Sequence, residues 1–265
     1  MFDCHMHTNF STDGKMNARQ ACEKALSIGL EGIVITDHQD IGFPGNDNAW
    51  SVDFSQYFNE LSMVQSEYTD RLKVLKGIEI GIQPHVIDES DALIKSYPFD
   101  YVLASVHIVD GYDPYQRMYY EGKSKSEAYR LYLEEIYFMI TNFPDFDMVA
   151  HFEYIARYAD YVDRTLRYAD HTDIFDSILK VLINRGRGFE VNTATFRDPN
   201  ASVEYDFAVL KRYRELGGEL ICLGSDAHRP EHIAMRFDYF AQMLKKAGFD
   251  YTVHFENRKP VWDRI

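Results

Sequence analysis

Histidine and acidic residues occur along the sequence in short motifs that suit metal binding. The most compact motif is His5-Met6-His7, and alternation along a strand would turn both imidazoles to the same face. Imidazole is the commonest side-chain metal ligand, and carboxylates complement it at zinc, iron or manganese. Similar residues recur farther along the chain: Asp37-His38, Glu79, His107, His151 and Asp226-Ala227-His228. We expect a metal centre if the fold brings these side chains together.

Strands predicted from short apolar runs end close to nearly all of these residues. The predicted strands cover 2–5, 32–36, 74–80, 101–107, 146–151, 188–192 and 220–224. Longer amphipathic segments predict helices over 17–28, 54–68, 126–141, 172–184, 203–216 and 231–247. This alternation predicts an α/β fold with a parallel sheet, as a closed barrel or a doubly wound open sheet. In both, the C-terminal strand ends share one face, where active sites form.

Composition narrows the classes of function. No Pro- or Gly-rich linker divides the 265 residues, so we expect a single domain over 1–265. The net charge of −14, without any basic run, disfavours a nucleic-acid partner. The three cysteines form no CxxC pair, which argues against disulfides and favours the cytoplasm. We also expect no signal peptide and no membrane span. P-loop, Rossmann and GxSxG motifs are absent from the sequence.

The order of the motifs resembles that of the polymerase-and-histidinol-phosphatase (PHP) superfamily. The motifs span His5 to His228 and comprise His-Met-His, Thr-Asp-His, Gly-Ile-Glu, Ser-Val-His, Ala-His and Ser-Asp-Ala-His. Within the superfamily the chain looks most like the histidinol-phosphate phosphatases. The segments 120–124 and 127–135 resemble an insertion of that branch, and Asn192-Thr193 also resembles its sequence.

The resemblance implies a distorted (β/α)7 barrel, similar to a TIM barrel, with the metal site at the C-terminal strand ends. It implies three divalent ions, zinc, iron, manganese or a mixture. By this resemblance the ligand sets are His5, His7, Glu79 and Asp226 for one ion; Glu79, His107 and His151 for a second; and Asp13, His38 and His228 for a third. Many relatives carry His where this chain has Asp13, so the third ion's occupancy and identity stay open.

The resemblance to this branch implies hydrolysis of L-histidinol phosphate to L-histidinol and phosphate, in histidine biosynthesis. Paired metals lower the pKa of a bridging water and neutralise phosphoryl charge, so that hydroxide attacks phosphorus. Asp226 or His228 would supply the proton that the alkoxide needs. Three arginines are candidates for binding the phosphate: Arg197, Arg157 and Arg117.

The rest of the substrate, a small phosphorylated amino alcohol, carries an ammonium group and an imidazole. Glu153 or Asp110 would meet the ammonium group. Three tyrosines are candidates for stacking on the imidazole: Tyr112, Tyr115 and Tyr119. These three tyrosines lie in residues 110–124, which we predict to form a long loop over the barrel mouth.

Other functions remain open on the sequence alone. A phosphatase or phosphodiesterase of the same fold would act on phosphotyrosine or a nucleotide, although a strand of nucleic acid would need a basic track. A non-enzymatic barrel would use its metals structurally, but structural zinc sites favour cysteine ligands. A metal-dependent amidohydrolase also uses HxH and a late Asp, but the Thr-Asp-His and Ser-Asp-Ala-His motifs fit it less well.

Overall fold

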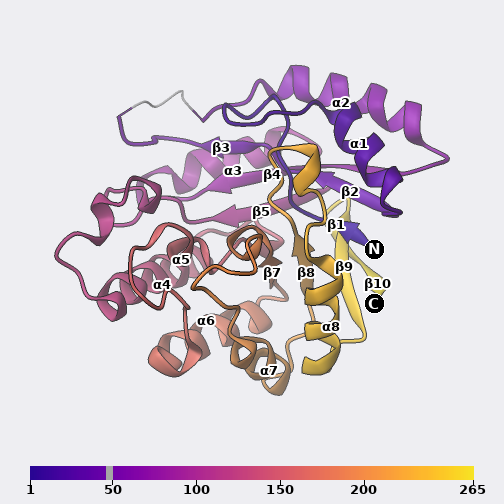
Figure 1. The fold of residues 1–265 in the computed structure, drawn as a ribbon. Coiled ribbons are helices and arrows are strands. Elements are labelled where there is room, and N and C mark those ends of the chain that lie inside the picture. The colour runs from indigo at the N-terminus through magenta and orange to yellow at the C-terminus, as the bar shows by residue number, and fades with distance from the viewer. Residues whose placement is uncertain (46–49) are drawn as a thin grey trace.

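A parallel sheet closes into a barrel at the centre of the molecule (Figure 1). The computed structural model describes residues 1–45 and 50–265. Neighbouring strands along the sheet are β1 (Phe2–Asp3), β2 (Gly32–Ile35), β4 (Lys73–Gly81), β5 (Tyr101–Ser105), β6 (Met148–Val149), β7 (Gly188–Asn192) and β8 (Ile221–Gly224). Every pairing along this path is parallel.

Backbone hydrogen bonds join the two ends of the sheet. The amide of Cys4 donates to the carbonyl of Leu223 over 3.0 Å, and that of His7 donates to the carbonyl of Ala227 over 2.8 Å. A parallel bridge pairs Met6 with Ala227. The first and last strands of the path therefore close the sheet, which confirms the distorted barrel over the open sheet.

The second strand of the barrel is broken in two. β2 pairs with the first half of β4, and β3 (His38–Asp40) pairs with its second half. Between them, the carboxylate of Asp37 accepts hydrogen bonds from the backbone and side chains of Thr8 and Ser11. This break places His38 inside a strand, whereas the sequence predicted it to follow one.

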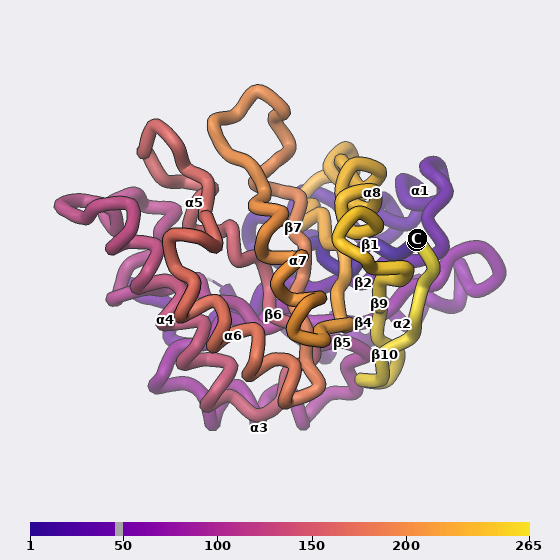
Figure 2. Tube along the Cα trace, turned by 90° about the horizontal axis from the view of Figure 1, so that it is seen from below, coloured from indigo at the N-terminus to yellow at the C-terminus, as the bar shows by residue number. Residues whose placement is uncertain are grey.

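Helices cover the outside of the barrel, and most lie where the sequence predicts them. These are α1 (Ala18–Ser27), α2 (Phe54–Tyr68), α4 (Lys125–Asn142), α6 (Thr172–Asn184), α7 (Phe207–Glu215) and α8 (Phe237–Ala247). Figure 2 shows α4, α6, α7 and α8 following one another around the outside. Side-chain caps begin several of them; Asn17, for example, forms a capping box with Gln20. None of the helices in the described residues is both long and apolar enough to cross a membrane.

Several short elements were not predicted. Two of them are helices: α3 (Ile87–Ser96), which follows β4 and a 3-10 turn, and α5 (Tyr154–Tyr158), which follows β6 after a short loop. The predicted loop 110–124 contains two 3-10 turns, η2 (Pro114–Gln116) and η3 (Met118–Tyr120). The other 3-10 turns are η1 (Pro84–Val86), η4 (Tyr168–Asp170), η5 (Ala194–Phe196) and η6 (Pro230–His232). The helix predicted over 231–247 starts only at Phe237, because η6 occupies its first residues.

A C-terminal hairpin completes the inner core of the barrel. It consists of β9 (Tyr251–Glu256) and β10 (Lys259–Arg264), which pair antiparallel. Val253 and Phe255 pack in a buried cluster whose other members include the strand residues Phe2, Val34, Leu75 and Tyr101. His254 stacks on Phe2, with ring centroids 3.7 Å apart, and bonds to Asp263. Neither strand of this hairpin was among those predicted from the sequence.

Candidate active site

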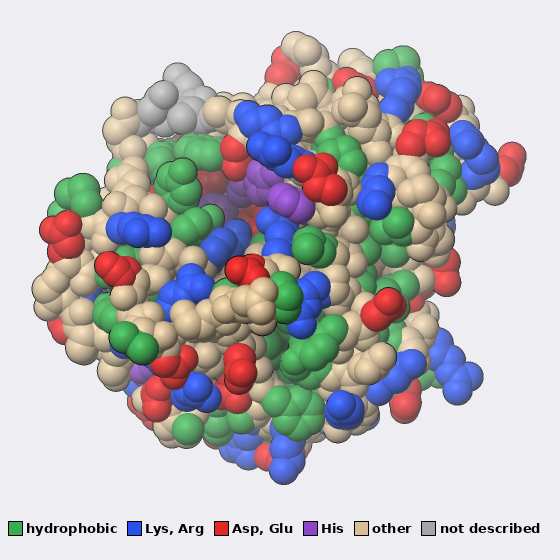
Figure 3. Space-filling model, viewed as in Figure 1, with side chains coloured by type: hydrophobic (Ala, Val, Ile, Leu, Met, Phe, Trp, Pro, Cys, Tyr) green, Lys and Arg blue, Asp and Glu red, His purple; other side chains and the backbone are tan. Residues whose placement is uncertain are grey.

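A cavity of about 340 Å³ opens at the C-terminal ends of the strands. Figure 3 shows histidine side chains gathered in a hollow on this face. The volume suits a small ligand and is too small for a macromolecule. Its lining comes from strand ends and the loops that follow them: Asp13, His38, Asp40, Phe43, Trp50, His107, Asp113, Tyr115, His151, Tyr154, Arg157, Tyr158, Asp226 and His228.

The side chain of Glu79, fully buried near the end of β4, lies at the centre of the histidine cluster. Its Oε2 is 2.9 Å from Nδ1 of His38 and 3.2 Å from Nε2 of His5. Its Oε1 is 2.8 Å from Nε2 of His151 and 3.2 Å from Nε2 of His107. Oε2 also lies 3.4 Å from Nε2 of His7, so Oε1 faces two imidazoles and Oε2 faces three.

His5 and His7 lie on one face of their segment, as alternation predicts. Their Nε2 atoms are 3.0 Å apart. Oδ1 of Asp226 lies 3.4 Å from the Nε2 of His7 and 3.8 Å from that of His5. The segment after β8 thus brings its carboxylate to the two imidazoles across the seam where the barrel closes.

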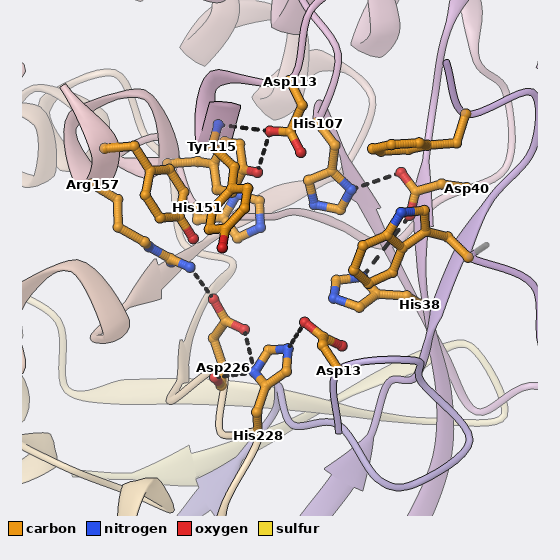
Figure 4. Close-up of a pocket in the computed structure, with 14 residues that line it drawn as sticks. Asp13, His38, Asp40, His107, Asp113, Tyr115, His151, Arg157, Asp226 and His228 are labelled. Atoms are coloured by element: carbon orange, nitrogen blue, oxygen red, sulfur yellow. Dashed lines mark hydrogen bonds and ion pairs between the residues drawn. The ribbon is translucent and has the colours of Figure 1, made fainter. Parts of the chain in front are cut away.

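The third group of predicted ligands lies nearer to solvent. Nε2 of His228 is 2.9 Å from Oδ2 of Asp13, whose side chain is 41% exposed. The ring of His7 contacts those of His38 and His228, with centroid distances of 4.0 and 4.2 Å, and the centroids of His38 and His228 are 5.7 Å apart. Figure 4 shows Asp13 beside His228 at the cavity wall.

The geometry groups the ligand atoms differently from the expected ligand sets. Sets of nitrogen and carboxylate atoms that all lie within 4.8 Å of one another are His5, His7 and Glu79; His38, Glu79 and His107; and His7, His38 and His228. His38 belongs to two of these sets because its short strand, β3, pairs directly with β4 beside Glu79.

The donor set fits divalent metal ions. Within the described residues, four buried polar atoms of the predicted ligands make no hydrogen bond, namely Asp13 Oδ1, Glu79 Oε2, His38 Nδ1 and His151 Nδ1. Glu79 Oε2 and His38 Nδ1 lie 2.9 Å apart but lack hydrogen-bond geometry. Leaving buried polar atoms unpaired costs about 1–3 kcal/mol each, so a native centre of this kind requires another partner. Nitrogen and carboxylate oxygen are the donors that zinc, iron and manganese accept.

Charges within the centre shift the pKa values of its members in opposite directions. Burial raises the pKa of Glu79, but His5, His38 and His107 outweigh it and hold that pKa well below its usual range. Burial also lowers the pKa of His7, and the neighbouring His38 and His228 lower it further. A carboxylate that stays ionised and an imidazole that stays neutral are the forms that bind metals.

Two carboxylates behind the histidines were missed by the sequence analysis. Oε1 of Glu190 lies 2.7 Å from Nδ1 of His5, and Oδ1 of Asp40 lies 2.7 Å from Nδ1 of His107. Each holds an imidazole so that its Nε2 points toward Glu79. One signal could have revealed the first of them, since Glu190 is a charged residue inside a predicted buried strand.

The three candidate arginines occupy different positions. Arg157 lines the cavity, and its Nη1 lies 2.8 Å from Oδ2 of Asp226 (Figure 4). Arg197 donates instead to the backbone carbonyls of Ser225 and Asp226, outside the cavity lining. Arg117 is exposed in the loop and does not line the cavity. Of the three arginines, only Arg157 therefore lines the cavity beside the predicted metal ligands.

The wall of the cavity opposite Asp226 is aromatic with one acidic side chain. Asp113 accepts hydrogen bonds from the hydroxyl of Tyr154 and the backbone of Tyr115, both over 2.8 Å. The ring of Tyr115 packs edge-on against Tyr158. Phe43 and Trp50 add further aromatic surface to the lining.

Most other candidates for substrate contacts lie away from this wall. Glu153 is buried outside the lining, and burial raises its pKa to about 8. Asp110 and Tyr112 are exposed and do not line the cavity. Tyr119 is buried and donates to the carbonyl of Ala128. Tyr115 alone among the candidate tyrosines lines the cavity.

Comparison with known proteins finds relatives that match nearly the whole chain. The histidinol-phosphatase of Lactococcus lactis is 34% identical over 258 residues, which is 97% of this chain and 95% of the relative. The probable histidinol-phosphatase of Clostridium acetobutylicum is 33% identical and covers 97% of this chain and 98% of its own.

Solved structures agree with these relatives. The crystal structure of histidinol phosphate phosphatase from Lactococcus lactis, complexed with zinc, L-histidinol and phosphate, superposes with a TM-score of 0.92. It is 33% identical and covers 98% of both chains. A putative histidinol phosphatase from Listeria monocytogenes shares the fold, with a TM-score of 0.79 at 19% identity. The PHP domain matches residues 3–194, and the chain belongs to the PHP domain family.

Proposed function

We propose that this protein hydrolyses L-histidinol phosphate to L-histidinol and phosphate, as a metal-dependent phosphomonoesterase of histidine biosynthesis. The convergence of histidines and carboxylates on Glu79, beside Arg157 in a small cavity, is the observation that carries this proposal. The similarity to the Lactococcus lactis enzyme, whose structure holds zinc, L-histidinol and phosphate, supports the choice of substrate.

Three divalent ions, of zinc, iron, manganese or a mixture, would be held by nine residues: His5, His7, Asp13, His38, Glu79, His107, His151, Asp226 and His228. Divalent metals in such a site neutralise phosphoryl charge and supply hydroxide from water at neutral pH. Asp13 is a hard oxygen ligand, and it suits any of these metals.

Arg157 is the residue that we assign to the phosphate. Its guanidinium is fixed by Asp226 over 2.8 Å, and by Asn192 and Thr195 over 3.2 Å each. A guanidinium carries five N–H donors, so donors remain for a phosphate oxygen in the cavity. Holding the group in advance lowers the entropy lost when the phosphate binds.

Asp226 and His228 are the residues that we assign to proton transfer. Burial raises the pKa of Asp226, but Arg157, His5 and His7 outweigh it and hold that pKa well below its usual range. An Asp226 that stays ionised has no proton of its own to give the alkoxide, so it would act through a water molecule that it orients. His228 lines the same wall, and it or a water beside it can protonate the leaving alkoxide.

The acidic and aromatic wall is suited to the amino-alcohol part of the substrate. Asp113 lies among aromatic side chains, where a carboxylate can meet an ammonium group. Phe43, Trp50, Tyr115 and Tyr158 offer ring faces to an imidazole. We place Asp113 in the role that the sequence suggested for Glu153 or Asp110.

The wider setting follows from composition. We place the enzyme in the cytoplasm as a single domain over 1–265, and we expect neither nucleic acid nor a membrane as its partner. Its three cysteines are unpaired and buried, in keeping with a reducing compartment. Its net charge of −14 repels nucleic-acid phosphates.

The proposal is tested by phosphate release from histidinol phosphate, compared with phosphotyrosine, nucleotides and an aryl phosphate, by metal-replete protein. We expect kcat/KM for histidinol phosphate to exceed the others about a hundredfold, or about 2.7 kcal/mol of transition-state binding. Equal, weak rates on all substrates would leave a metal-dependent phosphatase with another substrate. Absence of release from every monoester would overturn the proposal.

A further inference from the structure

Asn192 lies between the residues around the metal site and the arginine assigned to phosphate. It is the last residue of β7 and is fully buried. Its Oδ1 accepts from Nη2 of Arg157 over 3.2 Å. Its Nδ2 donates to Oε2 of Glu190 over 3.0 Å and lies 3.5 Å from Nδ1 of His5. One amide group therefore contacts both halves of the site.

The orientation of this amide is fixed by its neighbours. The backbone N–H of Ala194 donates to Oδ1 of Asn192 over 2.9 Å, and an N–H can only donate. The guanidinium of Arg157 is likewise only a donor. A flipped amide would place its NH₂ against both donors, so the oxygen must face Arg157 and the nitrogen must face Glu190.

Glu190 connects Asn192 to two of the histidines. Its Oε1 lies 2.7 Å from Nδ1 of His5, and its Oε2 also accepts from the backbone N–H of His151 over 3.0 Å. The side chain is almost fully buried. It holds its position only if each oxygen keeps its donors, and Asn192 is one of them.

We propose that Asn192 is a positioning residue that holds Arg157 and the carboxylate of Glu190 together, so that the phosphate site and the metal site keep one geometry. The inference rests on the proposed function, because it takes Arg157 to bind phosphate. It assigns to Asn192 no contact with substrate or metal.

Three substitutions separate the two contacts of Asn192. Asn192→Ala removes both. Asn192→Asp keeps an oxygen toward Arg157 but replaces the donor to Glu190 with an oxygen, so that two carboxylates meet. Thr195→Val is the matched control, because it removes the contact to Nε of Arg157 and touches neither Glu190 nor His5.

The measurements are a zinc titration of the metal-free protein against a chelator, and binding of inorganic phosphate to zinc-saturated protein. We expect Asn192→Asp to weaken zinc binding about 10- to 100-fold, the usual effect of changing a group behind a metal ligand, and phosphate binding much less. Thr195→Val should weaken phosphate binding about tenfold at unchanged zinc affinity. Asn192→Ala should weaken both.

Wild-type zinc affinity in Asn192→Asp would overturn the link to Glu190, and wild-type phosphate affinity in a folded Asn192→Ala would overturn the link to Arg157. If Asn192→Ala does not fold, the near-isosteric Asn192→Asp still decides the first link. Asn192→Ser, whose shorter side chain withdraws the oxygen from Arg157, then decides the second link: wild-type phosphate affinity in this variant at saturating zinc would overturn it. Failure of the wild-type protein to bind phosphate would instead count against the proposed function.

Discussion

A Cβ atom placed on Gly224 would lie 1.7 Å from Oε1 of Glu190, so the glycine leaves open the space that this carboxylate fills. The same atom would lie 2.6 Å from Cβ of His5. Gly224 ends β8, directly beside β7 and across the seam from the first strand. The position of the carboxylate behind His5 therefore depends on a residue without a side chain on the neighbouring strand.

Replacing Gly224 with alanine should lower both stability and zinc affinity. Overpacking of a well-packed interior costs about 1–3 kcal/mol, and here the displaced group is the carboxylate that orients His5. Urea unfolding of the metal-free protein measures the first effect. The cost should be smaller, though not zero, in a Glu190→Ala background, since His5 remains close. Strictly additive costs in the double variant would contradict this account.

Removal of the central carboxylate should abolish metal binding and activity together. In Glu79→Gln the amide is uncharged, and it cannot balance the imidazoles or two ions as a carboxylate can. We expect metal content, measured by elemental analysis, to fall along with a loss of hydrolysis of at least about a thousandfold, or roughly 4 kcal/mol. Glu121→Gln, which makes the same replacement at an exposed glutamate, is the control. Full activity with metals lost would refute the metal mechanism.

Replacing each of the three candidate arginines should change kcat/KM to a different extent. Arg157→Lys loses the planar fork and its contacts to Asp226 and Asn192, so we expect kcat/KM to fall about 30- to 100-fold, equivalent to about 2–3 kcal/mol. Arg117→Ala should stay within about twofold of the wild type, because its side chain is exposed away from the cavity. Arg197→Ala should change kcat/KM only indirectly, because Arg197 bonds to the backbone carbonyls of Ser225 and Asp226. A larger loss in Arg117→Ala than in Arg157→Lys would reverse our assignment.

Loss of Asp13 should remove metal selectively. Asp13 contacts His228 at the solvent side of the centre, while Glu79 and His5 are fully buried. We therefore expect Asp13→Ala to bind about one metal equivalent fewer per chain and to keep the more deeply held ions. Metal-to-protein ratios after gel filtration measure this. An unchanged ratio would show that Asp13 is not a ligand.

A histidine far from the metal site should make the fold sensitive to acid. Burial lowers the pKa of His171 from its ordinary value of 6.5. Below pH 6.5 the unfolded chain therefore binds a proton that the folded chain still excludes, and stability must fall as the pH falls. We expect the free energy of unfolding to fall less between pH 7 and 5 in His171→Gln than in the wild type. Equal falls, measured by urea unfolding at each pH, would contradict the expectation.

The strand ends could be predicted because their residues are locally distinctive. An apolar run followed by His, Asp or Glu is visible at His107 and His151 without any knowledge of distant contacts. Glu190 was missed because it lies within such a run, and only its partner across the barrel, His5, shows what it does. The choice among the arginines likewise depended on which loop turns inward, and spacing along the chain carries no such information.

The C-terminal hairpin was not predicted because the residues of its turn are unusual. Asn257 and Arg258 both have positive φ, at 49° and 64°, as a two-residue hairpin turn requires. Glycine usually fills the second position, so an arginine there conceals the turn. Arg258 is held in this conformation by ion pairs with Asp145 and Asp147. A contact between distant segments thus replaces the local preference on which turn prediction relies.

The seam that closes the barrel also sets an order of events during synthesis. Residues 4–7 bond to residues 223–227, and the two flanks of the seam supply His5 and His7 on one side and Asp226 and His228 on the other. While a ribosome still holds the second flank, the emerging chain has only part of the proposed metal site. Assembly of the complete site must therefore wait until residue 228 of 265 has left the exit tunnel. A nascent chain shorter than this should not retain zinc as the finished protein does.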